Sequence, residues 1–416
     1  MLKGKRSKLS AKRWQAFLLS FVVSVTFLVY LIVVATRSRI KSIGHVATTS
    51  QQHNDSVGRF TQQEHYILTA SYYLIDLEVA APLPDQGIDY TMNAIFCPLD
   101  WHLQKSSPST VPMFRDLIEK SIHCQSNKIK LDLQSIVTKA RRFDMTNTLG
   151  TAAPTTLPLS GVVFHETRCG STLVANLLAG SSDTHRVYSE SGPPLAALQL
   201  CEGTQHCNNA AQDAVLRDVI YLMSRSHNPK EQHVFFKFQS VGVRSIHVFT
   251  RVFPTTPWIF VYRDTIEILM SHLKSKDQEK AVCLRSRSHP HALLRQVVGH
   301  RDVDSLSAVE FCAAHLASLC EAAIQEASGM FIPYSSLPDR IWELVLPNHF
   351  GIKNIDIDRM KVVASVYSKG RGEKANQEWQ ADSQWKQDKA WEEIRNAAEM
   401  FVKRKFDKME ELSHAK

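Results

Sequence analysis

A short apolar run, a tight turn and a helical pattern follow one another between Gly161 and Leu178. The run GVVFH has the length and composition of a buried strand, and STLVANLL places apolar side chains at helical spacing. A turn that joins a strand to a helix this closely directs backbone N–H groups and the positive end of the helix dipole at one point. The segment therefore predicts the strand–loop–helix unit of an α/β protein, with a turn that can bind an anion.

The chain after this segment continues to alternate between strand and helix patterns. Apolar strand patterns recur as HRVYSE, HVFFKF, PWIFVYR and MFIPYSSLP, and residues 308–327 and 391–412 have helical periodicity. Strands that alternate with helices indicate a parallel sheet covered by helices. We therefore predict an α/β fold of the P-loop type, a parallel sheet flanked by helices, over residues 151–416.

The residues of the turn are those that an anion-binding loop requires. Gly170 lets the backbone approach an anion, Ser171 and Thr172 add hydroxyl donors at the first helical turn, and Arg168 adds a planar cation. A loop that hydrolyses ATP or GTP would need the pattern GxxxxGK[ST], and no lysine adjoins Ser171 here. The alternative is an ordinary strand-to-helix turn, in which Ser171 caps the helix and Arg168 is solvated.

A second anion position follows the strand pattern PWIFVYR. Arg263 stands at the carboxyl end of that strand, and Ser271 follows eight residues later, about two turns along the next helix. Ligands of open parallel sheets bind beyond the carboxyl ends of the strands, so both residues can share a phosphate at the edge that carries Arg168. Two anion positions at one edge suit a nucleoside with phosphates at both ends.

The pairing of FHETRCGSTLVANLL with WIFVYRDTIEILMSH resembles the PAPS-dependent sulfotransferase superfamily in its Golgi membrane-bound form, and particularly sulfotransferase-like proteins predicted in algae and other protists. PAPS, 3′-phosphoadenylyl sulfate, is the co-substrate that this resemblance implies, with no metal. It also implies that the 5′-phosphosulfate is held by Arg168, Cys169, Gly170, Ser171 and Thr172. The 3′-phosphate would be held by Arg263 and Ser271. The family's proline after Arg-Asp is replaced here by Thr265.

The resemblance extends over residues 160–410. The segment FIPYSSL at 331–337 is similar to the family's tyrosine segment at a strand end. The segment YSKGRG at 367–372 is similar to a basic, glycine-containing loop that closes on the 3′-phosphate and the adenine, which implies roles for Lys369, Gly370 and Arg371. A solvated surface loop is the alternative for this segment.

Sulfuryl transfer is an in-line displacement, in which negative charge moves onto the leaving phosphate oxygen. The protein must place cations at that oxygen and a base at the acceptor hydroxyl. Arg168 is one candidate cation. Lys237, within the apolar pattern FFKF, is another, because a lysine there is costly to bury without an anionic partner. An edge-strand lysine that points to water is the alternative.

Glu190 is the predicted catalytic base. It ends the strand pattern HRVYSE, and its position resembles that of the family's catalytic carboxylate after the first helix. His165 is a further catalytic candidate, since an imidazole with a pKa near 6.5 suits proton transfer. His185 and Glu166 are alternatives as base. Cys169 has no role in such a reaction and is predicted to be structural.

The activity predicted from these residues is transfer of a sulfuryl group from PAPS to an acceptor hydroxyl, first on a glycan, then on a protein or a small metabolite. A P-loop kinase or NTPase is one alternative. A non-catalytic, membrane-tethered binding module with the same fold is the other. The net charge of +8 arises partly from the first 13 residues, so the chain lacks the general basic face of a nucleic-acid binder.

The N-terminus predicts a membrane anchor over residues 16–36. Within it, the twenty residues 16–35 carry no charge and, at about 1.5 Å each, match a hydrocarbon core roughly 30 Å thick. The basic tail 1–15 is expected to be cytoplasmic, which makes the chain a type II protein of the Golgi membrane with a lumenal catalytic domain. A stem over 37–62, with a glycosylation sequon at Asn54, and an extension over 63–150 packed on the main domain would follow.

An oxidising lumen would allow disulfides among the cysteines. The chain has eight, at positions 97, 124, 169, 201, 207, 283, 312 and 320. Cys201 and Cys207 bracket a short loop and are the first predicted pair. Cys97 with Cys124 is the second.

Overall fold

The computed structural model describes residues 60–79, 92–146, 154–202, 208–273 and 281–415. Residues 60–416 form one compact unit. The predicted basic tail, membrane span, glycosylation sequon and most of the stem lie outside the described residues. Within the described ranges, no helix combines the length and apolar character needed to cross a bilayer.

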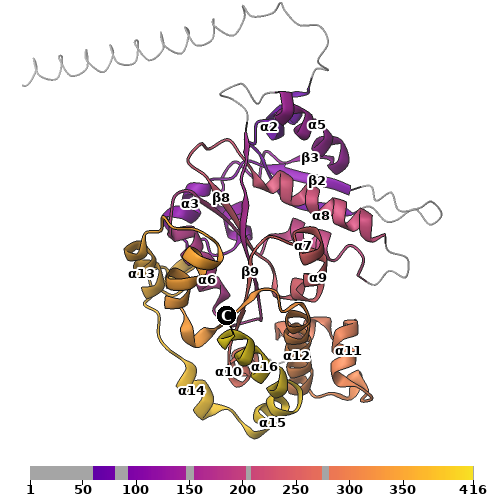
Figure 1. The fold of residues 1–416 in the computed structure, drawn as a ribbon, viewed down its shortest axis with the longest axis vertical. Helices are drawn as coiled ribbons and strands as arrows, with labels where there is room; N and C mark the ends of the chain where they lie inside the picture. The colour runs from indigo at the N-terminus through magenta and orange to yellow at the C-terminus, as the bar shows by residue number, and fades with distance from the viewer. Residues whose placement is uncertain (1–59, 80–91, 147–153, 203–207, 274–280, 416) are drawn as a thin grey trace, which may run out of the picture. The chain divides into compact units, whose positions relative to one another are not determined.

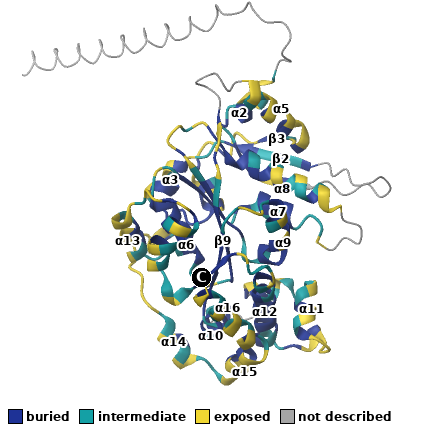
Figure 2. Cartoon of the chain, in the orientation of Figure 1, coloured by how far each residue is buried: buried dark blue, intermediate teal, exposed yellow. Residues whose placement is uncertain are grey.

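Five parallel strands form the central sheet of the unit, in the order β10–β9–β5–β8–β6 (Figure 1). Their bounds are Met330–Pro333 for β10, Trp258–Tyr262 for β9, Leu159–His165 for β5, His233–Lys237 for β8 and His185–Ser189 for β6. All five residues of β9 and of β6 are buried, as Figure 2 shows for the middle of the molecule. Unbroken apolar strands are expected where helices cover both faces of a parallel sheet. The predicted parallel sheet is confirmed.

Helices lie on both sides of this sheet. They are α6 (Ser171–Gly180), α7 (Gly192–Leu198), α8 (Asn209–Ser224), α9 (Ile246–Val252), α10 (Thr265–Leu273), α11 (Ala292–Val298), α12 (Ala308–Glu326), α13 (Ile357–Ser365), α14 (Ser383–Lys389), α15 (Glu392–Phe401) and α16 (Lys403–His414). In Figure 1, α6 and α13 lie on one side of the sheet, and α7, α9 and α12 on the other. The helical pattern at 391–412 is two helices, because the chain turns at Val402 so that both α15 and α16 pack against α12.

The order of the strands creates a crevice at the carboxyl edge of the sheet. After β5 the chain passes through α6 to β6 on one side, and after β9 it passes through α10 to β10 on the other. The neighbouring ends of β5 and β9 are therefore followed by connections that leave in opposite directions. Such a switch point is where open parallel sheets bind ligands.

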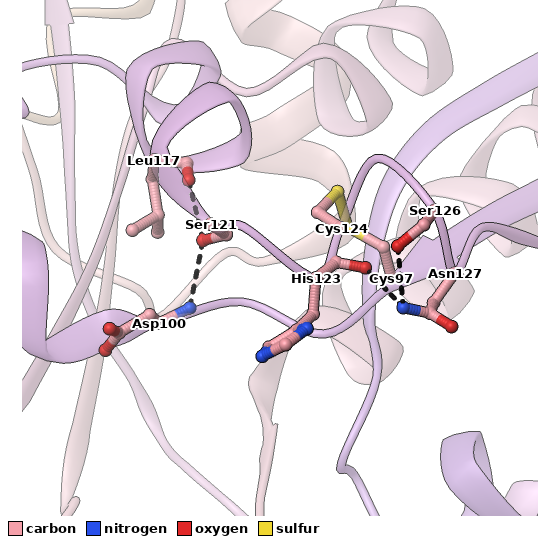
Figure 3. The surroundings of a disulfide bond; sticks show 8 residues. All are labelled: Cys97, Asp100, Leu117, Ser121, His123, Cys124, Ser126 and Asn127. Carbon is pink, nitrogen blue, oxygen red and sulfur yellow. Dashed lines mark hydrogen bonds between the residues drawn. A yellow bond between two sulfur atoms is a disulfide. The ribbon is translucent and has the colours of Figure 1, made fainter.

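Residues 60–146 build a second, antiparallel sheet with its own helices. The strands are β1 (Tyr73–Val79), β2 (Met92–Cys97) and β3 (Ile129–Asp132), and the helices are α2 (Gln62–Leu68), α3 (Trp101–Ser106), α4 (Phe114–Lys120) and α5 (Leu133–Thr146). A disulfide between Cys97 and Cys124 joins the end of β2 to the segment after α4, which confirms that predicted pair (Figure 3). Nearby, the backbone N–H of Asp100 donates to Ser121 Oγ over 3.0 Å.

Buried ion pairs join this N-terminal region to the central sheet. Lys105 Nζ of α3 lies 2.8 Å from Glu231 Oε1, and the same carboxylate binds Arg186 of β6. The guanidinium of Arg186 also lies over the Trp101 ring of α3, 5.1 Å from its centroid. Because a buried charge needs a partner of opposite sign, these contacts fix α3 against the sheet.

A second disulfide, which was not predicted, lies in the C-terminal half of the chain. Cys283, in the 3₁₀ turn Val282–Ser286, is bonded to Cys312 of α12. Cys207 of the other predicted pair lies outside the described residues. Cys169 and Cys320 are free and buried.

Candidate functional site

A cavity of about 710 Å³ opens at the carboxyl edge of the central sheet. Most of the predicted site residues line it, namely His165, Arg168, Cys169, Gly170, Ser171, Thr172, Glu190, Arg263, Ser271, Lys369 and Arg371. The two predicted anion positions, around Arg168 and Arg263, thus open into the same cavity. Lys237 and Gly370 are not part of its lining.

The loop between β5 and α6 has the backbone of an anion-binding turn. Gly170 has φ 88° and Arg168 has φ 61°, so both lie in the left-handed region. The backbone N–H groups of Arg168, Gly170 and Thr172 have no hydrogen-bond acceptor among the described residues. Arg168 is exposed, while Ser171 and Thr172 are buried at the start of α6. Free donors at a helix N-terminus beside an arginine favour a bound phosphate or sulfate.

Glycine is required at position 170 by its positive φ and also by the closeness of Tyr334. A Cβ at position 170 would lie 2.6 Å from Cδ2 of Tyr334, whose ring covers the loop. Replacing Gly170 with alanine is expected to displace that ring, to cost about 1–3 kcal/mol in unfolding free energy, and to weaken binding of adenosine 3′,5′-bisphosphate by ~10-fold or more. Thermal unfolding and calorimetric titration measure the two effects.

The matched control is Gly299→Ala. Gly299 also has a left-handed φ, 70°, but a Cβ there meets nothing within 4 Å. This variant should show the strain cost alone, with unchanged nucleotide binding. Equal binding losses in the two variants would show that the Tyr334 contact is irrelevant to the site.

Glu190 and Lys237 form an ion pair at the ends of two neighbouring strands. Ser189 of β6 is in register with Lys237 of β8, which brings the Lys237 ammonium onto the Glu190 carboxylate. Burial alone would raise the pKa of Glu190, but the positive charge of Lys237, with a smaller contribution from His165, lowers it to about 2. Lys237 is buried and has the anionic partner that was predicted for it. That partner is Glu190, the residue predicted to be the catalytic base.

His165 lies at the end of β5 with both ring nitrogens against backbone carbonyl groups. Its Nδ1 faces Glu166 O, and its Nε2 lies 2.9 Å from Phe238 O. Burial and then the charge of Lys237 lower the pKa of His165 to about 4, so the ring is neutral at neutral pH. A neutral ring donates one hydrogen bond, to one of these carbonyls. This arrangement favours a role in positioning the loop over the predicted role in catalysis.

The other candidate bases are placed elsewhere. His185 lies at the opposite end of β6 from the cavity, where its Nδ1 is 2.9 Å from Leu178 O. Glu166 is buried beneath the loop, where its carboxyl group accepts the Arg263 N–H over 3.1 Å. Burial raises the pKa of Glu166 to about 8. Neither residue lines the cavity.

Cys169 is a free, buried cysteine. It was predicted to be structural because sulfuryl transfer needs no thiol. Its thiol donates to Glu166 O over 2.9 Å. Burial raises its pKa to about 12, so the thiolate is absent at neutral pH. The side chain is turned inward even though the residue contributes to the cavity wall.

Arg263 is held at the edge of the cavity by two carboxylates and an aromatic ring. Its Nε binds Glu267, and its Nη2 lies 2.7 Å from Asp382 Oδ1. Its guanidinium stacks 3.9 Å from the centroid of the Tyr334 ring, the same ring that covers Gly170. Tyr334 follows β10 and therefore connects the two anion positions physically. Ser271 lines the cavity nearby, and its hydroxyl donates to Glu267 O over 2.8 Å.

The predicted basic loop lies over the same cavity. Asn176 of α6 donates to Ser368 O over 2.9 Å, which ties the loop to the helix that begins at Ser171. Arg371 pairs with Asp116 of α4, with Nη2 2.6 Å from Oδ2. Burial lowers the pKa of Lys369 to about 8, and the charges of Lys237 and Arg168 act in the same direction. The Glu190 carboxylate acts in the opposite direction, but Lys369 has no ion pair among the described residues.

Several residues of the cavity were not predicted from the sequence. Among them are Met113, Arg115, His272, Trp379, Asp382 and Lys386. Met113 and Arg115 come from the N-terminal region, which shows that this region forms part of the site. Among the described residues, no group of three His, Cys, Asp or Glu side chains is placed to hold a metal ion.

The comparisons with known proteins give structural similarity only. No protein-family model matches the sequence, and no curated protein matches it. The chain is similar to a sulfotransferase from Alicyclobacillus acidocaldarius, with a TM-score of 0.34 and 10% identity over 62% of this chain and 96% of that one. It is also similar to the sulfotransferase domain from the curacin biosynthetic pathway, with a TM-score of 0.33 and 11% identity over 59% of this chain and 98% of that one. Superpositions at this level carry no argument about function, which depends on the site.

Proposed function

We propose that this chain is a sulfotransferase that moves a sulfuryl group from PAPS to a hydroxyl group of an acceptor. One observation carries the proposal. The free N–H groups around Gly170 and the Arg263 position open into a single cavity, which also contains the Glu190 carboxylate paired with Lys237. A ligand with a 5′-phosphosulfate and a 3′-phosphate has anions at both ends and can fill both positions.

Each part of the donor has a matching set of side chains. Arg168 and the loop N–H groups would hold the 5′-phosphosulfate, and Arg263 with Ser271 would hold the 3′-phosphate. A second, more apolar cavity of about 520 Å³ shares Arg263, Tyr334 and Trp379 with the first and offers room for the adenine. Lys369 would close over the nucleotide from the basic loop.

The reaction follows from the pairing of Glu190 with Lys237. The acceptor oxygen forms a bond to sulfur while the bond from sulfur to the bridging phosphate oxygen breaks. The electron pair moves onto that oxygen, where Arg168 and Lys237 stabilise it, and Glu190 takes the acceptor proton. When Lys237 turns toward the leaving oxygen, Glu190 loses its main positive neighbour. Its pKa then rises, which makes it a stronger base at the moment of transfer.

A glycan hydroxyl in the Golgi lumen is the acceptor we propose first. The uncharged run at 16–36 and the sequon at Asn54 support a membrane-anchored, lumenal protein. Arg115 and Arg285 line the cavity and have no ion-pair partner among the described residues. These two cations favour acceptors that carry carboxylate or sulfate groups near the reacting hydroxyl.

The test is transfer from ³⁵S-labelled PAPS by the full-length protein onto a panel of neutral glycans, acidic glycans, tyrosine peptides and small alcohols. We expect label on at least one class, and binding of adenosine 3′,5′-bisphosphate that Arg168→Ala weakens. Magnesium-dependent phosphate release from ATP, without binding of the bisphosphate, would contradict the proposal. An inert protein that still binds the bisphosphate would favour a non-catalytic binding module.

A further inference from the structure

Asp382 occupies a position built for a phosphate group. Its Oδ1 lies 2.7 Å from Arg263 Nη2, and its Oδ2 lies 2.7 Å from Lys386 Nζ. The hydroxyl of Ser383 accepts from the same Arg263 Nη2 over 3.1 Å and donates to Glu267 Oε2 over 2.8 Å. An arginine and a lysine around one anion are donors that proteins use for phosphate oxygens.

The same donors belong to the cavity. Arg263 and Lys386 both line it, together with Ser271 and Asp382. Lys386 is only 2% exposed, and Asp382 is its one ion-pair partner among the described residues. Burial lowers the pKa of Lys386, and the adjacent Asp382 carboxylate acts against this effect. A ligand group that displaces the Asp382 carboxylate is therefore favoured when it brings a negative charge of its own.

Asp382 lies at the end of an exposed segment. Residues 372–381 are all exposed, and they follow the outside of the molecule between α13 and α14 (Figure 2). The side chain of Asp382 is 48% exposed, whereas that of Arg263 is 7% exposed. The carboxylate can therefore swing into solvent, while Arg263 stays in place against Glu267 and Tyr334.

We propose that Asp382 competes with the 3′-phosphate of the nucleotide for Arg263 and Lys386. This competition lowers the affinity of the protein for nucleotides that carry a 3′-phosphate. The inference rests on the proposed function, because it takes the Arg263 position as the 3′-phosphate position. A phosphate that binds Arg263 Nη2 and Lys386 Nζ takes both donors that hold Asp382, and the like charge of the two anions displaces the carboxylate. The nucleotide thus binds less tightly than its contacts alone would allow, and the spent bisphosphate is released as Asp382 returns.

The test compares two nucleotides on two variants of the full-length protein by isothermal titration calorimetry. Adenosine 3′,5′-bisphosphate carries the competing phosphate, and adenosine 5′-monophosphate lacks it. Asp382→Asn should tighten binding of the bisphosphate by ~10-fold and leave binding of the monophosphate nearly unchanged. Asp388→Asn removes the same charge from α14 at an exposed position outside the cavity lining, and should change neither affinity.

The outcomes separate the two proposals. Weaker or unchanged bisphosphate binding in Asp382→Asn would overturn the competition. An equal gain for both nucleotides would also overturn it, because the effect would then not depend on the 3′-phosphate. The wild-type protein tests the proposed function by itself, since it must bind the bisphosphate more tightly than the monophosphate. If it binds neither nucleotide, both proposals fail.

Discussion

Replacing Glu190 with glutamine is expected to lower kcat for sulfuryl transfer by about 10²- to 10⁴-fold, the usual contribution of a general base. Glutamine keeps the size of the side chain and an oxygen for Lys237, but it cannot take the acceptor proton. Binding of adenosine 3′,5′-bisphosphate should remain close to that of the wild type. Steady-state kinetics with labelled PAPS and calorimetric titration measure the two quantities.

The control for this variant is Glu373→Gln, an exposed carboxylate on the segment beyond the basic loop. It should retain full activity. If Glu190→Gln transfers sulfate at the wild-type rate, Glu190 is not the base, and His165→Gln becomes the next variant to measure. A loss of activity that accompanies a loss of nucleotide binding would instead point to a structural role for the ion pair with Lys237.

Replacing Glu231 with alanine is expected to lower the free energy of unfolding by about 3–5 kcal/mol. The change leaves Arg186 and Lys105 without the carboxylate that both contact, and the side chain of Arg186 is fully buried. Urea unfolding of the full-length protein, followed by tryptophan fluorescence, measures the loss. The matched control is Glu78→Ala, which breaks an exposed pair with Lys130 and should cost less than about 1 kcal/mol.

The contribution of Glu231 should also depend on pH. Burial alone would raise its pKa, but the charges of Arg186 and Lys105 outweigh this and lower the pKa below its ordinary value of 4.5. A lowered folded-state pKa stabilises the protein fully above pH 4.5, and this stability is lost as pH falls through the folded value. Glu231→Gln should therefore flatten the loss of stability in that acidic range. An unchanged acid transition, or equal losses in Glu231→Ala and Glu78→Ala, would contradict this account.

The sequence was sufficient to predict the central sheet and to name most of the predicted site residues that line one cavity. The strands β5 and β9 are unbroken apolar runs, so their burial and parallel pairing follow from composition. Because parallel strands end at one edge, residues at those ends could be placed together, as Arg168 and Arg263 are. Lys237 in an apolar strand required a buried anion, and Glu190 at the end of the next strand supplies it.

The parts that could not be predicted depend on contacts between distant segments. Asp382 and Lys386 come from a polar stretch of sequence that is typical of a solvated surface segment, and only the fold brings them to Arg263. The disulfide of Cys283 with Cys312 depends on how a 3₁₀ turn packs on α12. The antiparallel sheet at 73–132 has short strands without a clear alternation, so the region could be recognised only as a packed extension.

The position of the N-terminal region has a practical consequence for truncated forms of the protein. A fragment that begins after residue 150 would keep every motif recognised in the sequence. It would lose Asp116, which anchors Arg371 of the closing loop, and Arg115 at the mouth of the cavity. It would also leave Arg186 without the aromatic cover of Trp101. The smallest segment suitable for expression is therefore set by these contacts and must start near residue 60.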